Sequence, residues 1–304
     1  MSPALRCRIQ PMSPHKDLDI SYHRGSMNKP AVVLIHGLGM DKHIWINPLM
    51  SRILGGLLPL QIILGKRTDV KTVYQDLKHD DYSVITWSQK RPMASIDTVV
   101  EELKEIIKIA KGLTKDGLVI IGHSRGGLVA RRYLLEGDPS IRVLITISTP
   151  HKGTILSRYA MYLSPFAERI EPLFSKTKGK FSSAVRRSLN FLKSEALKEL
   201  LPDSPFFKTL KDKPRKGVYY RSMGGTYPTL FTMAGIRIPD SLCKVIPEGL
   251  CPPELKIGEG DGMVSAASSV LSWADKHFNF ELNHADILFD KMVRNKILHE
   301  VERL

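Results

Sequence analysis

One serine occupies the position that nucleophilic serines take in a strand-to-helix turn. Residues 122–126 read Gly-His-Ser-Arg-Gly, which places a glycine two positions away from Ser124 on each side. The apolar run 118–121 precedes this motif, and the segment 128–135 after it has a helical pattern. A serine on such a sharp turn has a strained backbone that small neighbours tolerate, and its hydroxyl projects above the sheet. We therefore predict that Ser124 is the nucleophile of a serine hydrolase rather than an incidental serine in a glycine-rich turn.

A serine hydroxyl needs a general base, and the base needs a carboxylate that orients it. In sheets of this type the acid and then the histidine follow the serine along the chain. His284 lies between the last predicted strand and the last predicted helix, where the base belongs. His277 and His299 lie within those two elements, so they are expected to be structural or exposed. The sequence therefore predicts His284 as the base.

Two aspartates compete for the role of the acid. Asp261 lies in the glycine-rich stretch 258–264, in which glycines let the chain turn tightly and present the carboxylate inward. Asp240 follows the predicted strand 230–234 more closely. We favour Asp261 as the acid and keep Asp240 as its rival.

The tetrahedral intermediate of acyl transfer needs hydrogen-bond donors for its oxyanion. Residues 36–39 read His-Gly-Leu-Gly and directly follow the first strongly apolar run. We predict that the backbone N–H groups of Leu38 and Arg125 form the oxyanion hole. His36 and Gly37 are expected to support this loop, His36 by hydrogen bonding rather than as a base. The role of the Arg125 side chain stays open.

The elements that must position these residues alternate between strand and helix patterns. Short apolar runs rich in β-branched residues, typical of strands buried on both faces, occur at 31–35, 82–87, 118–121 and 143–147. An amphipathic helix, two more strands and a closing helix are predicted at 99–110, 230–234, 277–281 and 286–304. Such alternation implies a mostly parallel sheet with helices on both faces, so the predicted fold class is α/β.

The segment 152–216 does not follow this alternation. It separates the fourth predicted strand from the fifth and carries no strand pattern. Within it, Ser204 and Pro205 form a helix start, because a capping hydroxyl precedes a proline at the first helical position. We interpret 152–216 as a helical cap, or lid, inserted into a core domain made of residues 1–151 and 217–304.

The charge of the chain is concentrated in this cap. The 304 residues have a formal net charge of +14, and residues 151–216 hold 15 Lys and Arg against 6 Asp and Glu. Such an excess favours anionic partners, and a lipid surface is the candidate because no nucleic-acid-binding motif accompanies the charge. The apolar residues of the cap could line a trough for an acyl chain, while its lysines face the lipid surface. Alternatively, the apolar residues pack on the core and the lysines are only solvated. The apolar residues concerned are Tyr159, Tyr162, Leu163, Phe166, Phe181, Val185, Leu189 and Leu192.

Cysteine usage and the N-terminal segment bear on the compartment. An odd count of three, without a Cys-x-x-Cys motif, argues against a disulfide framework or a zinc site. Cys243 and Cys251 could pair across a short loop, but we predict free thiols in a reducing compartment. Residues 1–10 lack a secretory signal, and the most apolar stretch, 53–64, is shorter than the about 20 residues that span a membrane. We expect a cytoplasmic protein, or a secreted one if a leader was removed.

These motifs together resemble those of the α/β-hydrolase superfamily, and within it the bacterial triacylglycerol lipases. The similarity rests on the segments 36–39, 122–131, 148–153, 261–264 and 283–284, of which 148–153 (Ser-Thr-Pro-His-Lys-Gly) and 261–264 (Asp-Gly-Met-Val) are the more lipase-like. The resemblance implies an α/β-hydrolase fold, hydrolysis of carboxylic esters on an acyl chain, and a mobile helical lid. Lipases of this kind more often have Met or Gln where this chain has Arg125, and they are commonly secreted. Some hold a structural calcium, for which Asp240 and Asp286 could supply carboxylates, but we predict no metal and no cofactor.

We therefore predict a carboxylic-ester hydrolase, a lipase or esterase, that acts on fatty-acyl esters through an acyl-enzyme. Ser124 would attack the ester, His284 would shuttle the proton, and Asp261 would orient His284. An acyltransferase would use the same triad with an alcohol in place of water. A non-catalytic lipid-binding protein of the same fold is a further alternative, against which the complete candidate triad argues.

Overall fold

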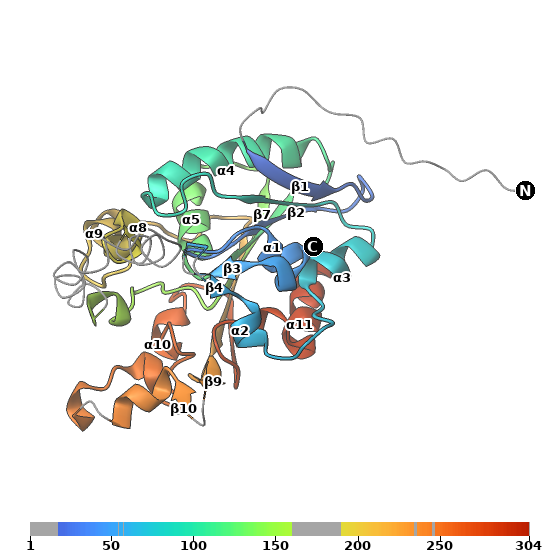
Figure 1. The fold of residues 1–304 in the computed structure, drawn as a ribbon. Helices are drawn as coiled ribbons and strands as arrows, with labels where there is room; N and C mark the ends of the chain where they lie inside the picture. The colour runs from blue at the N-terminus through green and yellow to red at the C-terminus, as the bar shows by residue number, and fades with distance from the viewer. Residues whose placement is uncertain are drawn as a thin grey trace, which may run out of the picture.

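A seven-stranded sheet in the order β1-β5-β2-β6-β7-β8-β11 organises the chain (Figure 1). The computed structural model describes residues 18–53, 55–56, 58–159, 190–233, 236–244 and 247–303. The strands of the sheet are β1 (Asp19–His23), β2 (Ala31–Ile35), β5 (Val84–Ser88), β6 (Leu118–His123), β7 (Ile141–Ile147), β8 (Tyr219–Gly225) and β11 (Lys276–Phe280). All pairs are parallel except β1 with β5. The predicted α/β class with a mostly parallel sheet is confirmed.

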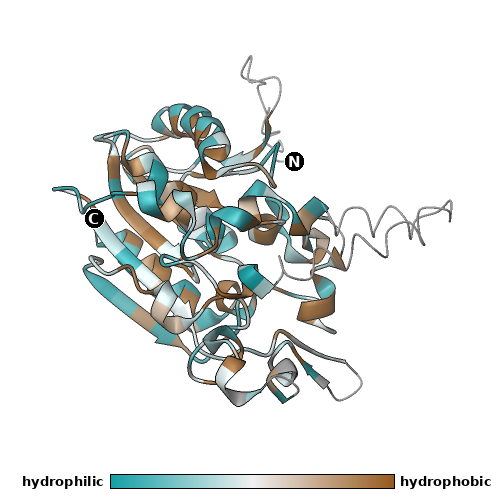
Figure 2. Cartoon of the chain, turned by 90° about the vertical axis from the view of Figure 1, so that its left-hand side faces the viewer, coloured by the Kyte–Doolittle hydropathy of each residue, from teal (hydrophilic) through white to brown (hydrophobic). Residues whose placement is uncertain are grey.

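Helices cover both faces of this sheet, which explains why its central strands are largely apolar. On one face, α4 (Ile96–Lys111) and α5 (Arg125–Leu134) pack on alternate residues of β2, such as Val33. On the other face, α3 (Val73–His79) and α11 (Lys291–Glu302) pack on the intervening residues, such as Val32. Figure 2 shows the result as hydrophobic strands inside and hydrophilic helix surfaces outside. Burial on two faces makes β2 fully buried.

The strand predicted at 230–234 exists, but its predicted place in the central sheet is wrong. Residues of this segment form β9 (Phe231–Met233), which pairs with β10 (Ile236–Ile238) in a separate two-stranded sheet. The fifth parallel strand is β8, which the sequence analysis missed. Its sequence, Tyr-Tyr-Arg-Ser-Met-Gly-Gly, has no continuous β-branched run, although its last four residues are buried. A strand whose buried apolar residues alternate with polar residues and glycines does not show the continuous apolar run of a strand buried on both faces.

The remaining elements are short and lie in the connections. Between β2 and α3 lie α1 (His43–Ile46), η1 (Pro48–Met50), the hairpin β3 (Arg52–Ile53) and β4 (Leu58–Pro59), and α2 (Gln61–Leu64). After β10 come η2 (Asp240–Lys244), η3 (Glu248–Leu250), η4 (Pro253–Leu255) and α10 (Ala266–Ser269). The helix predicted at 286–304 is divided into η5 (Asp286–Leu288) and α11. The division arises because the Asp290 carboxylate caps α11 by accepting from the N–H groups of Met292 and Val293.

The segment 152–216 enters after β7 and leaves before β8, two strands that pair directly. Its described residues, 152–159 and 190–216, include α8 (Glu195–Glu199) and α9 (Pro205–Thr209). Ser204 caps α9 and Pro205 is its first residue, as predicted. Most of the proposed apolar stripe of the cap lies outside the described residues: Tyr162, Leu163, Phe166, Phe181, Val185 and Leu189.

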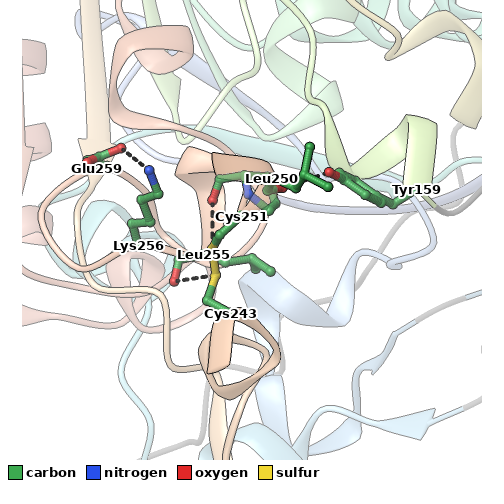
Figure 3. The surroundings of a disulfide bond; sticks show 8 residues. Tyr159, Cys243, Leu250, Cys251, Leu255, Lys256 and Glu259 are labelled. Atoms are coloured by element: carbon green, nitrogen blue, oxygen red, sulfur yellow. Dashed lines mark hydrogen bonds and ion pairs between the residues drawn. A yellow bond between two sulfur atoms is a disulfide. The ribbon is translucent and has the colours of Figure 1, made fainter. Parts of the chain in front are cut away.

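A disulfide joins Cys243 to Cys251, so the prediction of free thiols at these positions is wrong (Figure 3). The 3₁₀ turns η2 and η3 fold the chain back and bring the two Cα atoms to 5.3 Å, within the range that a disulfide requires. Cys243 and Cys251 therefore give no indication of a reducing compartment. Beside this bond, the Tyr159 hydroxyl donates to the carbonyl oxygen of Leu250 at 2.8 Å.

No helix within the described ranges is long and apolar enough to cross a membrane.

Candidate active site

Ser124 lies at the junction of β6 and α5 with a strained backbone. Its φ of 53° and ψ of −128° are unusual for a residue with a side chain, and its N–H donates to the carbonyl oxygen of Ile147 at 2.8 Å. A Cβ added at Gly122 would lie 2.5 Å from a backbone nitrogen of the following helix, and one at Gly126 would lie 2.5 Å from the Ile35 carbonyl oxygen. The turn therefore closes only because both flanking positions are glycine.

Asp261 and His284 form a buried hydrogen-bonded pair. His284 Nδ1 lies 2.8 Å from Asp261 Oδ2, and the two residues are 5% and 0% exposed. The other carboxylate oxygen of Asp261 accepts from the N–H groups of Met263 at 3.0 Å and Val264 at 2.7 Å. Because an ionised carboxylate can only accept, Nδ1 of His284 carries the proton and Nε2 is left as the basic nitrogen. This is the arrangement that a general base requires.

The rival acid occupies a different part of the chain. Asp240 begins η2, in the excursion between β10 and the Asp261 loop. The other candidate calcium ligand, Asp286, is engaged by the protein itself, because its carboxylate accepts from Arg67 and from the Asn283 amide. Among the described residues no group of three or more His, Cys, Asp and Glu side chains could hold a metal ion.

His123, which directly precedes Ser124, brings His284 to the strand-to-helix turn of residues 122–126, called the elbow below. The rings of His123 and His284 lie 4.7 Å apart between centroids, and His123 Nε2 donates to the His284 carbonyl oxygen at 3.0 Å. Burial lowers the pKa of His123 well below its usual value, so the ring is neutral. Within the described ranges the side-chain hydrogen bond of His284 runs to Asp261, and none joins it to the Ser124 hydroxyl. Contacts between nucleophile and base often tighten only when substrate binds.

Asn283 fixes the backbone on the other side of His284. Its amide oxygen accepts from the N–H groups of Ala285 and Asp286, and its amide nitrogen donates to the Thr229 carbonyl oxygen at 2.9 Å. The roles of His123 and Asn283 were not predicted from the sequence, although both residues lie next to a predicted catalytic residue and within the lipase-like segments 122–131 and 283–284.

The predicted oxyanion loop touches the elbow. A Cβ added at Gly37 would lie 3.0 Å from the Cβ of Ser124. In the part of the chain that the structure describes, the N–H groups of Leu38 and Arg125 donate to no protein acceptor. The Arg125 N–H is at the start of α5, where N–H groups lack intrahelical partners and the helix dipole favours negative charge. Both groups are therefore available to an oxyanion.

His36 is part of a hydrogen-bonded brace beneath this loop. Its Nδ1 donates to the Gly37 carbonyl oxygen at 2.9 Å, and its Nε2 accepts from the Gln89 N–H at 3.1 Å. The Gln89 amide in turn donates to the His36 carbonyl oxygen at 3.2 Å. Burial lowers the pKa of His36 to about 4, so the ring is neutral at pH 7 and keeps one donor and one acceptor nitrogen. The supporting role of Gln89 was likewise not predicted from the sequence.

A mostly parallel sheet with a strained serine between strand and helix places the chain in the α/β-hydrolase superfamily, as the sequence motifs indicated. The model of the palmitoyl protein thioesterase family matches residues 31–214, more than half of the chain, and the chain belongs to this family. The match includes the oxyanion loop and the elbow and ends before Asp261 and His284. No curated protein matches the chain by sequence.

Solved structures show the same fold at low identity. The mature form of Bacillus licheniformis lipase BlEst2 superimposes with a TM-score of 0.57 and 16% identity, over 92% of this chain and 98% of that one. Its propeptide form gives a TM-score of 0.59 and 14% identity, over 92% of this chain and 53% of that one. Family and fold together indicate an α/β-hydrolase with activity of the lipase or esterase type on small ester or lipid substrates.

Proposed function

We propose that this protein hydrolyses fatty-acyl esters, acyl thioesters included, through an acyl-enzyme formed on Ser124. The observation that carries the proposal is the buried hydrogen bond from His284 Nδ1 to Asp261 Oδ2, held against the elbow by His123. A buried carboxylate on one imidazole nitrogen, with the other nitrogen free near a strained serine, is the arrangement that activates a hydroxyl.

The reaction follows from these positions. Ser124 Oγ adds to the acyl carbonyl carbon while His284 Nε2 takes the hydroxyl proton, and Asp261 stabilises the resulting imidazolium. The oxyanion accepts from the N–H groups of Leu38 and Arg125. His284 then returns the proton to the departing alcohol or thiol. Water repeats the sequence on the acyl-enzyme and releases the fatty acid, with Ser124 regenerated.

Two observations support a long acyl chain and a thioester as the substrate. The family to which the chain belongs is described as palmitoyl protein thioesterase, which extends the expected substrate from oxygen esters to thioesters. Large apolar side chains near the acid loop are also exposed: Tyr159 by 36%, Met263 by 39%, Leu250 by 60% and Ile257 by 61%. Each CH₂ of an acyl chain that such surfaces remove from water contributes about 0.8 kcal/mol. The basic segment 152–216 would favour an anionic lipid surface as the source of substrate.

The test compares p-nitrophenyl esters from acetyl to palmitoyl, together with palmitoyl-coenzyme A as a thioester whose released thiol is measured. The proposal expects the highest kcat/KM at long chains and a loss of about 10⁴-fold or more in Ser124→Ala. Ser157→Ala is the matched control, because Ser157 is a buried serine outside the proposed site, and it should retain wild-type activity. A maximum at acetyl would overturn the long-chain assignment. Absence of activity on every substrate, or full activity in Ser124→Ala, would overturn the proposed function.

A further inference from the structure

The side chain of Arg125 is buried beneath the elbow, although its backbone N–H is a proposed oxyanion donor. The residue is 1% exposed, and its Nη2 lies 3.2 Å from Oε2 of Glu199. The guanidinium also donates to the carbonyl oxygens of Ala94 and Pro92, the latter at 3.4 Å. Arg125 therefore joins the elbow to the loop between β5 and α4 and to α8, which lies in the 152–216 segment.

The Glu199 carboxylate interacts with both the Arg125 side chain and the start of α4. Its carboxylate forms the ion pair with Arg125 and accepts from the N–H of Ile96, the first residue of α4, at 2.8 Å and 3.0 Å. Burial raises the pKa of Glu199 and lowers the pKa of Arg125, so each charged side chain depends on the other. An ion pair in such surroundings specifies one arrangement of the groups that it joins.

The loop that Arg125 anchors is also the loop that braces the second oxyanion donor. Residues 89–95 run from Gln89, which exchanges two hydrogen bonds with His36, to the carbonyl oxygens that accept from Arg125. His36 in turn supports the backbone that leads to Leu38. Arg125 thus contacts Glu199 directly, and the loop that carries Leu38 is connected to both residues through residues 89–96.

We propose that the Arg125–Glu199 ion pair is a positioning element that holds the N–H groups of Leu38 and Arg125 at the oxyanion. This role rests on the proposed function. Glu199 lies in α8, so the contact of α8 with Arg125, rather than the attachment of the 152–216 segment as a whole, sets the geometry of the oxyanion hole. Displacing a reacting group by about 1 Å can cost on the order of 10²-fold in rate, which gives a small shift at this pair a measurable consequence.

A second ion pair of the same type provides a matched control. Arg131, also in α5, makes two hydrogen bonds of 2.7 Å to Asp212, and the two side chains are 8% and 5% exposed. Asp212 lies in the same inserted segment, so this pair also attaches that segment to α5. Arg131 contacts His151 rather than any group of the oxyanion loop. Breaking the Arg131–Asp212 ion pair should weaken the attachment of residue 212 to α5 without moving the N–H groups of Leu38 and Arg125.

The experiment measures kcat, KM and the inhibition constant of an alkylboronic acid for Glu199→Gln, Arg125→Met and the double variant, beside Asp212→Asn and Arg131→Met. Active sites are counted by fluorophosphonate labelling, so that rates refer to folded enzyme. Gln keeps an acceptor for the Ile96 N–H, and the double variant leaves no unpaired buried charge, which guards against simple unfolding.

The proposal expects Glu199→Gln, Arg125→Met and the double variant to lose about tenfold or more in kcat per active site, with KM within about twofold. Binding of the boronic acid, which mimics the tetrahedral intermediate, should weaken in parallel. The Asp212 and Arg131 variants should lower Tm but keep kcat. Equal kcat losses in both sets, or unchanged kcat at Glu199, in an active wild type would overturn the positioning role and leave the proposed function standing. A wild type without any hydrolysis would overturn both.

Discussion

Replacing Asp261 by Asn should abolish most of the activity while leaving the fold intact. The structure fixes how the new amide would orient. Two backbone N–H groups, those of Met263 and Val264, donate to Oδ1 of Asp261, so the oxygen of Asn must remain there. The NH₂ group of Asn then faces His284 Nδ1 and can only donate to it. His284 is forced into the tautomer with its proton on Nε2, which cannot accept the proton of Ser124.

The magnitude follows from the loss of the base. A triad aspartate changed to asparagine with its geometry kept lowers kcat by about 10⁴-fold, equivalent to about 5 kcal/mol of transition-state stabilisation. The assay is p-nitrophenyl ester hydrolysis at pH 7.5, with urea denaturation to show that the free energy of unfolding is little changed. Asp240→Asn is the control and should retain wild-type kcat. If Asp261→Asn kept more than about a tenth of the activity while Asp240→Asn lost it, the assignment of the acid would be refuted.

Three further predictions concern stability. Burial lowers the pKa of His36 to about 4, so below pH 6.5 the unfolded chain binds a proton that the folded chain excludes. The free energy of unfolding should therefore fall by about 3 kcal/mol between pH 6.5 and pH 4, and urea titrations of His36→Asn should show a smaller dependence on pH. Replacing both Cys243 and Cys251 by Ser should lower the free energy of unfolding by about 2 kcal/mol, because the disulfide no longer restricts the unfolded chain. Thiol titration of the denatured, unreduced wild type should detect only Cys7, and detection of three free thiols would contradict the disulfide. Gly122→Ala should destabilise the protein by about 1–3 kcal/mol in the same urea assay, because its Cβ meets backbone atoms, and an unchanged midpoint would show that the elbow relaxes.

The sequence predicted those parts of the fold whose residues are continuous apolar runs or amphipathic repeats. The run 31–35 coincides with β2, and the helical pattern at 99–110 lies inside α4. Strand β8 escaped prediction because its buried apolar residues, Tyr220 and Met223, are separated by Arg221 and Ser222 and followed by two glycines. It packs closely against α10, where a side chain at Gly224 would meet Ser269. Such packing is a property of the three-dimensional neighbours and leaves no periodic signal in the strand itself.

The residues of the candidate site likewise divide into those with a signal in the sequence and those without one. The positions of Ser124 at the strand-to-helix turn and of His284 before the last helix were predictable, because motif and element order restrict where a candidate nucleophile and a candidate base can lie. The preference for Asp261 over Asp240 rested on the glycine-rich stretch around it and on the lipase-like segment 261–264, and in the structure His284 is hydrogen-bonded to Asp261. The supporting contacts of Gln89, Asn283 and Glu199 join segments far apart in the chain, for which one sequence offers no signal. The disulfide was missed because pairing depends on how η2 and η3 fold back rather than on the cysteine count.

The most direct test of the central claim is to trap the nucleophile. The protein is incubated with a long-chain alkyl fluorophosphonate, and the modified residue is identified by mass spectrometry of the peptides. The proposed chemistry expects one adduct per chain on Ser124, no labelling of Ser124→Ala, and labelling slowed on the order of 10⁴-fold in Asp261→Asn. An adduct on another residue, or no adduct on the folded wild-type protein, would contradict the assignment of Ser124 as the nucleophile.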